Sequence, residues 1–229
     1  MVLTGRVLYN QFTSFSVSLS DLDQGTELAG ISPEFFHREA IASARTVDPS
    51  LTLYRSAASR ADVLWFYTHI TGSEEISRVI LENASKNNVP PSLAFALAWA
   101  ESNYQPMAVG RNATSIDRGL FQLNNRAFPK LTEREFFNIE TNAHYGLSHL
   151  SYCLDLSGNE VAALAMYNAG PTKVANNNTP RRTLDYVSKI LNYKQGLERL
   201  FNQQVASRYQ INGSEVHPLP GSTQIAGRK

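Results

Sequence analysis

Residues 91–102 read PSLAFALAWAES, an almost continuous run of apolar side chains that ends in a carboxylate and a hydroxyl. We expect a helix over residues 92–102. Its apolar residues, from Leu93 to Trp99, leave no face polar, and a helix that is apolar all round belongs in the middle of a hydrophobic core. The stretch therefore predicts the central helix of a mostly α-helical domain, with Glu101 at its end.

The segments around this helix carry ordinary helix signals. Residues 76–84 place apolar side chains at i, i+3, i+4 and i+8 behind two glutamates, which predicts an amphipathic helix that ends at Asn88. Thr132 and Glu135 have the spacing of a capping box. The other expected helices cover residues 61–70, ending at Gly72, then a stretch around 143–154 that stops near Gly158, residues 161–167, and a last long helix through 184–191. Residues 103–130 are expected to form loop and short extended pieces.

The two ends of the chain are less regular, and we assign the main domain to residues 73–208. Residues 1–72 form an N-terminal extension. In it, Phe15, Val17 and Leu19 alternate with serines, which favours an edge strand or, equally, a disordered arm. Residues 32–44 predict a short helix that begins at Ser32 and Pro33. Residues 209–229 are polar, contain prolines and glycines, and are expected to be a flexible tail.

Composition excludes several functional classes. The chain has 229 residues and a net charge of +1, which argues against a nucleic-acid-binding protein. Its one cysteine, Cys153, excludes an intramolecular disulfide and is expected to lie in the core, and its five histidines show no paired-ligand spacing, so we expect no metal and no cofactor. The longest apolar stretch has eight residues, so no integral membrane segment is expected. The N-terminus shows no recognisable signal peptide, and nothing indicates an oligomeric state.

Glu101 is the candidate catalytic residue. A carboxylate at the end of an apolar helix is desolvated, which disfavours its charged form and raises its pKa toward the value that a general acid needs near neutral pH. The alternative is a solvated glutamate or a helix cap.

Four motifs follow Glu101 in order. They are Glu101-Ser102, then Gly119-Leu120-Phe121-Gln122, then Ala165-Met166-Tyr167-Asn168-Ala169-Gly170, and finally Thr183-Leu184-Asp185-Tyr186-Val187. Together, over residues 91–191, they resemble the soluble-type (SLT) lytic transglycosylases. The resemblance implies a lysozyme-like domain with a small extended segment flanking a cleft. It also implies peptidoglycan glycan strands as the substrate and the bacterial cell envelope or periplasm as the location.

In that family a single glutamate, here Glu101, acts as both acid and base and yields 1,6-anhydro-N-acetylmuramic acid (1,6-anhydroMurNAc) products. The same resemblance suggests substrate-binding residues, for which capping, backbone hydrogen bonding or core packing are the alternatives. These residues are Ser102, Gln122, Asn124, Tyr167, Asn168 and Tyr186. One position departs from the family pattern: Arg182, beside Arg181, replaces a glutamate that often precedes the last motif. The two arginines either attract substrate carboxylates or form a solvated basic turn.

Asp117 leaves a second activity open. The stretch around Glu101 and Asp117 also resembles hen-type lysozyme, and the residues near Glu101 resemble goose-type lysozyme as well. In the hen-type enzymes the aspartate is a second catalytic carboxylate. If Asp117 had that role, the protein would be a muramidase that hydrolyses the same bond with water; otherwise Asp117 is a turn residue. A third alternative is a poorly active glycan-binding module.

Overall fold

The computed structural model describes residues 48–213 and 215–226, and these form one compact unit from Pro49 onward. The strand or arm expected near residues 15–19 and the helix expected over residues 32–44 lie outside the described residues. None of the described helices is both long and apolar enough to cross a lipid bilayer.

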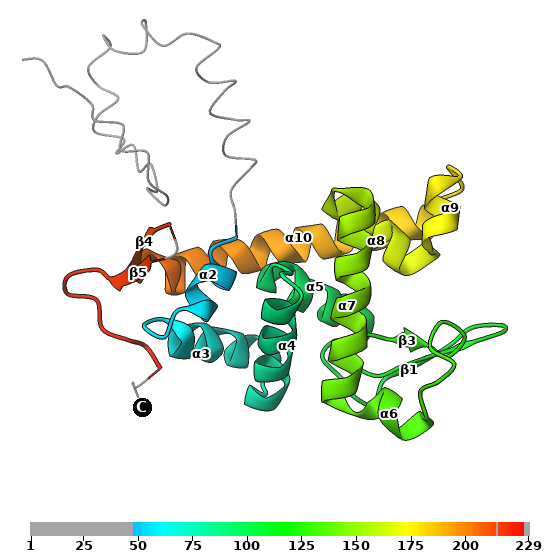
Figure 1. Cartoon of the computed structure of the whole chain (residues 1–229), viewed down its shortest axis with the longest axis horizontal. Coiled ribbons are helices and arrows are strands. Elements are labelled where there is room, and N and C mark those ends of the chain that lie inside the picture. Colours follow the sequence, from blue (N-terminus) through cyan, green and yellow to red (C-terminus); the bar gives the residue numbers. More distant parts are fainter. Residues whose placement is uncertain (1–47, 214, 227–229) are drawn as a thin grey trace, which may run out of the picture. The chain divides into compact units, whose positions relative to one another are not determined.

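The described chain is mostly helical, as predicted (Figure 1). Its helices are α2 (Ser50–Arg55), α3 (Arg60–Thr71), α4 (Glu74–Lys86), α5 (Pro91–Ser102), α6 (Glu133–Phe137), α7 (Ile139–Ser157), α8 (Glu160–Ala169), α9 (Pro171–Ala175), α10 (Arg181–Gln204) and the short 3-10 helix η3 (Ala206–Arg208). The capping box of Thr132 and Glu135 forms at the start of α6. Gly72 and Gly158 end α3 and α7 in left-handed conformations, which glycine adopts without steric cost.

Two small antiparallel sheets complete the fold. β1 (Val109–Arg111), β2 (Ile116–Arg118) and β3 (Leu123–Asn124) lie in that order, and Asp117 pairs with Gly110 on one side and Asn124 on the other. β4 (Tyr209–Asn212) and β5 (Glu215–Pro218) form a separate hairpin. In Figure 1 the hairpin lies at one end of α10, and α8 and α9 lie near the other.

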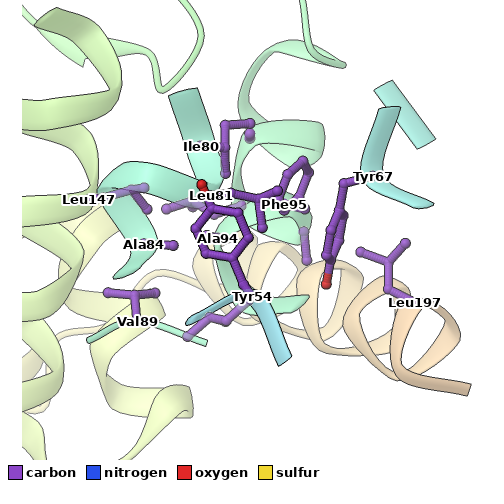
Figure 2. Close-up of a cluster of buried hydrophobic side chains, with 14 of the residues drawn as sticks. Tyr54, Tyr67, Ile80, Leu81, Ala84, Val89, Ala94, Phe95, Leu147 and Leu197 are labelled. Atoms are coloured by element: carbon purple, nitrogen blue, oxygen red, sulfur yellow. The ribbon is translucent and has the colours of Figure 1, made fainter. Parts of the chain in front are cut away.

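α5 occupies the centre of the core, as its composition predicted. Every residue from Pro91 to Ala98 is buried. The helix packs against α10 and α4, and the ring of Phe95 stacks on Tyr67 of α3 at 3.9 Å between centroids (Figure 2). These contacts hold the helix in place up to the turn that carries Glu101.

The structure differs from the expected domain limits at both ends. Leu53 of α2 and Phe66 of α3 belong to the same core cluster as α5, so helices that we assigned to an extension are part of this unit. Tyr209–Asn212 and Glu215–Pro218, expected in a flexible tail, form the paired strands β4 and β5. The hairpin buries Tyr209 and Ile211 of β4, whose period-two spacing is the pattern of a half-buried strand, and Val216 of β5.

Asp62 fastens the C-terminal segment to α3. Its carboxylate is fully buried and accepts hydrogen bonds from the Tyr209 hydroxyl at 2.8 Å and from the backbone N–H groups of Ile225 and Ala226 at 2.9 and 3.0 Å. Bonds to an ionised acceptor are stronger than neutral ones, and a buried donor left without a partner is costly. One side chain therefore holds both the hairpin and the residues that follow it.

Replacing Asp62 with alanine should release this segment. The Asp62→Ala variant leaves three donors without their acceptor, so we expect the free energy of unfolding to fall by about 3 kcal/mol and residues after Arg208 to become sensitive to protease. Urea unfolding and limited proteolysis measure the two effects. Asp155→Ala, an exposed carboxylate on α7, is the control and should change stability by less than about 0.5 kcal/mol; equal behaviour of the two variants would contradict the role of Asp62.

Candidate active site

Glu101 lies on the last turn of α5, where the helix leaves the core. The helix ends at Asn103, whose φ is +51°, and Tyr104 follows with φ +62°. Two successive left-handed residues turn the chain sharply away from the helix axis, and Tyr104 is buried. Glu101 itself keeps partial exposure, so its carboxylate stands at the boundary between the core and solvent.

A tyrosine from α10 holds this carboxylate. The Tyr186 hydroxyl donates a hydrogen bond to Glu101 Oε1 at 2.5 Å. Burial and the neighbouring negative charge of Glu101 raise the pKa of Tyr186 well above its ordinary value, so the phenol remains a donor. The contact joins residues 85 positions apart, and it exists because α5 and α10 pack along each other.

The surroundings of Glu101 raise its pKa to about 7. Burial is the largest cause, since desolvation disfavours the charged form, and the negative charge of Asp117 adds to it. The hydrogen bond from Tyr186 and the positive charge of Lys189 act in the opposite direction. A carboxyl group with a pKa in this range can both give and take a proton near neutral pH.

Ser102 and Tyr167 both reach the turn of residues 119–122. The Ser102 hydroxyl lies 2.7 Å from the Leu120 carbonyl oxygen and 3.1 Å from that of Ala98, so its single proton serves these backbone acceptors. The Tyr167 hydroxyl donates to the Phe121 carbonyl oxygen at 3.0 Å. These two side chains connect α5 and α8 to the turn.

Gln122 sits in the same turn with φ +46°, and its side chain is engaged locally. Its Nε2 donates to the carbonyl oxygens of Gly119 at 2.8 Å and Ala108 at 3.1 Å. Asn168 lies apart from these groups: it is exposed at the end of α8, where its Oδ1 accepts from the Thr183 hydroxyl at 2.8 Å. In the described structure both amides thus have protein partners.

Asn142 is a site residue that the sequence analysis missed. It is fully buried on α7; its Oδ1 accepts from the Phe121 N–H at 2.7 Å, and its Nδ2 donates to the carbonyl oxygens of Arg118 and Phe136 at 2.9 and 2.8 Å. A Cβ on Gly119 would lie 2.3 Å from Asn142 Nδ2, so that glycine is required. In the sequence, the one sign of this role is that Asn142 stands next to apolar residues of α7.

Gly146 was missed for a related reason. A Cβ at this position of α7 would come within 2.5 Å of the Phe121 side chain. The absence of a side chain lets the buried phenylalanine of the turn press against the helix backbone. A glycine inside a helical pattern signals such a close approach, although the sequence does not say which partner approaches.

Asp117 and Asn124 form a pair on the small sheet. Asn124 Nδ2 donates to Asp117 Oδ1 at 2.6 Å, and Asn112 Nδ2 donates to the other oxygen at 2.7 Å. The carboxylate is held by two amides and is close enough to raise the pKa of Glu101. Asn124, predicted as a substrate-binding residue, is thus a partner of Asp117 in this structure.

Other predicted residues lie outside this arrangement. Arg181 and Arg182 are exposed in the first turn of α10. Cys153 is buried, as predicted, and its surroundings raise the pKa of the thiol to about 11. The described residues contain no group of three or more histidine, cysteine, aspartate or glutamate side chains that could hold a metal ion.

Fold and site together define a class. A mostly helical domain that presents a carboxylate of raised pKa from the end of its central helix, beside a small antiparallel sheet, has the arrangement of a lysozyme-like domain. The family model described as "Transglycosylase SLT domain" matches residues 78–188. This range contains Glu101, Tyr167 and Tyr186. The chain belongs to the SLT transglycosylase family.

The chain is also similar to curated proteins and to a solved structure. The X polypeptide of Escherichia coli is 31% identical over 113 residues, which cover 44% of this chain, and the X polypeptide of strain K12 is 30% identical over 121 residues, which cover 48%. The matches span 63% and 68% of these relatives' own lengths. The structure of an inactive mutant of the lytic transglycosylase Slt from Pseudomonas aeruginosa is 20% identical with a TM-score of 0.47, covering 81% of this chain and 37% of that one.

The Tyr186→Phe variant should raise the pKa of Glu101 above its value of about 7. The Tyr186 hydrogen bond stabilises the charged form of Glu101. Because the variant lacks this bond, we expect the pKa of Glu101 to rise by about one unit. A carbon-13 NMR titration of the glutamate carboxyls, assigned with Glu101→Gln, measures it. Tyr167→Phe is the matched control, because that hydroxyl donates to a backbone carbonyl and its loss should move the value less. An unchanged or lowered pKa in Tyr186→Phe would contradict the role of this bond.

Glu101 should make folding less favourable as the pH rises. Its pKa is about 4.5 in the unfolded chain and about 7 in the folded protein. Between these values the folded state keeps a proton that the unfolded state has released, so stability falls with pH until both forms are ionised. Glu101→Gln removes this effect. The free energy of unfolding of the variant minus that of the unaltered protein should therefore increase by up to about 3 kcal/mol from about pH 4 to about pH 8. Urea unfolding at both pH values measures it; a pH-independent difference would contradict it.

Proposed function

We propose that the protein is a lytic transglycosylase that cleaves the β-1,4 bond between N-acetylmuramic acid and N-acetylglucosamine in peptidoglycan strands. The observation that carries the proposal is Glu101, a carboxylate with a pKa of about 7 that is held by Tyr186 within the matched SLT domain. A carboxyl group poised near neutral pH is suited to act first as an acid and then as a base.

In the first step Glu101 is protonated and gives its proton to the glycosidic oxygen. The bond between C1 of the muramic acid and that oxygen breaks, and the N-acetylglucosamine side leaves as an alcohol. Positive charge develops at C1 in an oxocarbenium-like transition state, with help from the substrate's own N-acetyl oxygen. Because Glu101 Oε1 accepts from Tyr186, the transferred proton is carried by Oε2.

In the second step the Glu101 carboxylate accepts the proton of the muramic acid C6 hydroxyl. The C6 oxygen attacks C1 and closes a 1,6-anhydro ring, so no water is consumed and the carboxyl group returns to its starting form. Nucleophile and electrophile belong to one sugar ring, which removes most of the entropic cost of bringing them together. One carboxylate therefore suffices for the whole reaction.

The remaining site residues support this chemistry by fixing positions. Ser102, Tyr167 and Asn142 hold the turn of residues 119–122 beside Glu101 through backbone contacts. Gln122, Asn124 and Asn168 contact protein groups in the described structure, and we propose that they meet the sugar's N-acetyl and hydroxyl groups from these restrained positions. A site whose groups are locked before substrate arrives loses little entropy on binding.

A muramidase is the second candidate function. Asp117 lies near enough to Glu101 to influence its pKa, and its carboxylate is held in a polar, hydrogen-bonded setting. That position also suits the second carboxylate of a glycosidase that uses two carboxyl groups. In this scheme Asp117 would stabilise or attack C1, and water would complete hydrolysis. The two schemes differ in their products. A glycan-binding module that does not turn over is a third outcome of the same experiment.

Peptidoglycan as the substrate places the site of action in the bacterial cell envelope. The glycan strand is the partner that the proposal requires.

Mass spectrometry of the fragments released from purified peptidoglycan tests the proposal. We expect ends that are lighter by one water than reducing ends and that take up no label from oxygen-18 water, and we expect Glu101→Gln to lower the rate by about 100-fold or more. Glu74→Gln, an exposed glutamate in the first turn of α4, is the control and should keep the unaltered rate. Reducing ends that carry the label would establish the muramidase instead, and binding without release would establish the binding module.

A further inference from the structure

One side of α10 carries two cations around the tyrosine that holds Glu101. Arg182, Tyr186, Lys189 and Tyr193 follow one another at spacings of four, three and four residues, so they share one stripe of the helix. The neighbouring stripe, with Thr183, Val187 and Ile190, is the buried one. From Arg182 to Lys189 the helix rises by about 10 Å. We call these two residues the flanking cations.

Lys189 is held on the side of the helix that faces α5. Its usual partner on a helix would be Asp185, four residues earlier, but no carboxylate in residues 48–213 or 215–226 lies within ion-pair distance of its ammonium group. The nitrogen lies instead 4.5 Å from the centroid of the Trp99 ring. A cation over an indole is attracted by the ring's negative face, which restrains the lysine chain.

Trp99 is itself fixed in place and belongs to the turn of α5 that carries Glu101. Its ring stacks on Tyr193 with centroids 4.0 Å apart and planes inclined by 10°. Lys189 and Tyr193 thus both contact the indole, two residues before the catalytic glutamate in sequence. The positive charge of Lys189 acts on Glu101, whose pKa it lowers. The lysine therefore presents a positioned charge next to the reacting carboxyl group.

Arg182 lies one turn before Tyr186 and is exposed. Like Lys189, it has no carboxylate at ion-pair distance within the part of the chain that the structure describes. Some other cations do have carboxylate partners: Lys194 pairs with Glu160 and Glu198, and Arg78 pairs with Glu82 and Glu140. Unpaired cations on both sides of the catalytic contact are available to an anionic ligand.

We propose that Lys189 and Arg182 bind carboxylates on the muramic acid residues of the glycan strand, on either side of the Tyr186–Glu101 contact. This inference rests on the proposed function, because it names the groups that the same site selects. A guanidinium can hold a carboxylate with two parallel bonds, and an ammonium acts as a point charge. The carboxylate comes either from the lactyl group of a peptide-free strand or from a stem peptide.

Binding measurements in an inactive background test the flanking cations. Glu101→Gln is combined with Lys189→Gln, with Arg182→Gln, or with Arg181→Gln as the matched control, since Arg181 is an exposed neighbour about 100° around the helix from Arg182. Calorimetry then uses three glycans: strands with stem peptides, peptide-free strands, and a chitin oligosaccharide, which carries no carboxylate. Thermal unfolding confirms that each variant is folded.

We expect Lys189→Gln and Arg182→Gln each to weaken binding of carboxylate-bearing strands by about 3–10-fold, less at high salt, and to leave the chitin oligosaccharide unaffected. A loss seen only with peptide-free strands assigns the lactyl carboxylate, because that group is an amide wherever a stem peptide is attached. A loss seen only with peptide-bearing strands assigns a carboxylate of the stem peptide, and a loss with both shows that the cations bind either carboxylate. Losses equal to that of Arg181→Gln, or equal on chitin, would overturn the inference and leave the proposed function standing. If Glu101→Gln binds none of the glycans, the inference is overturned, and the proposed function then stands or falls on the release experiment.

Kinetics of the active protein give an independent test of the binding role of Lys189. At about pH 5.5 Glu101 is protonated with or without Lys189, because its pKa lies near 7. Under that condition Lys189→Gln should raise KM on strands and leave kcat nearly unchanged, as expected for a group that binds substrate and transition state equally. A fall in kcat with unchanged KM would instead overturn the binding role.

Discussion

The hydrogen bond between Tyr186 and Glu101 is the contact on which the functional arrangement depends. It is possible only because α5 is buried along its length and α10 lies against it. Burial of α5 desolvates the carboxyl group and raises its pKa, and the tyrosine limits that rise while fixing one oxygen. Packing, rather than any local feature of the Glu101 backbone, sets the proton affinity of the residue.

The turn of residues 119–122 joins β2 to β3 and is held mainly by side chains of other elements. Its backbone groups are satisfied by side chains from three helices: Ser102 of α5, Asn142 of α7 and Tyr167 of α8. A backbone group left unpaired in such a place would cost free energy, so each of these side chains both satisfies and positions the turn. Gly119 and Gly146 supply the space that these contacts need.

Charge is distributed unequally around the site. Asp117 has two amide partners, and Glu101 has a phenol. The nearby cation Lys189 lies over an aromatic ring rather than beside a carboxylate. Elsewhere on α10, Lys194 contacts two glutamates. Among the described residues, the stripe that runs past Tyr186 therefore carries positive charge that no carboxylate neutralises at ion-pair distance.

The sequence by itself determined the helical class, the central place of residues 92–102, the capping box at Thr132 and the helix end at Gly158. These follow from apolar periodicity and from local backbone chemistry, which neighbouring residues decide among themselves. Ordered motifs also singled out Glu101 and Tyr186 together with the family.

Only the tertiary structure decided which distant groups meet. The roles of Asn142 and Gly146, the attachment of residues 209–226 to Asp62, and the seating of Lys189 on Trp99 all depend on partners from other elements. A polar side chain or a glycine looks alike in a sequence whether it faces solvent or a buried partner. The difference is made by the packing of helices that are far apart along the chain, which no local pattern records.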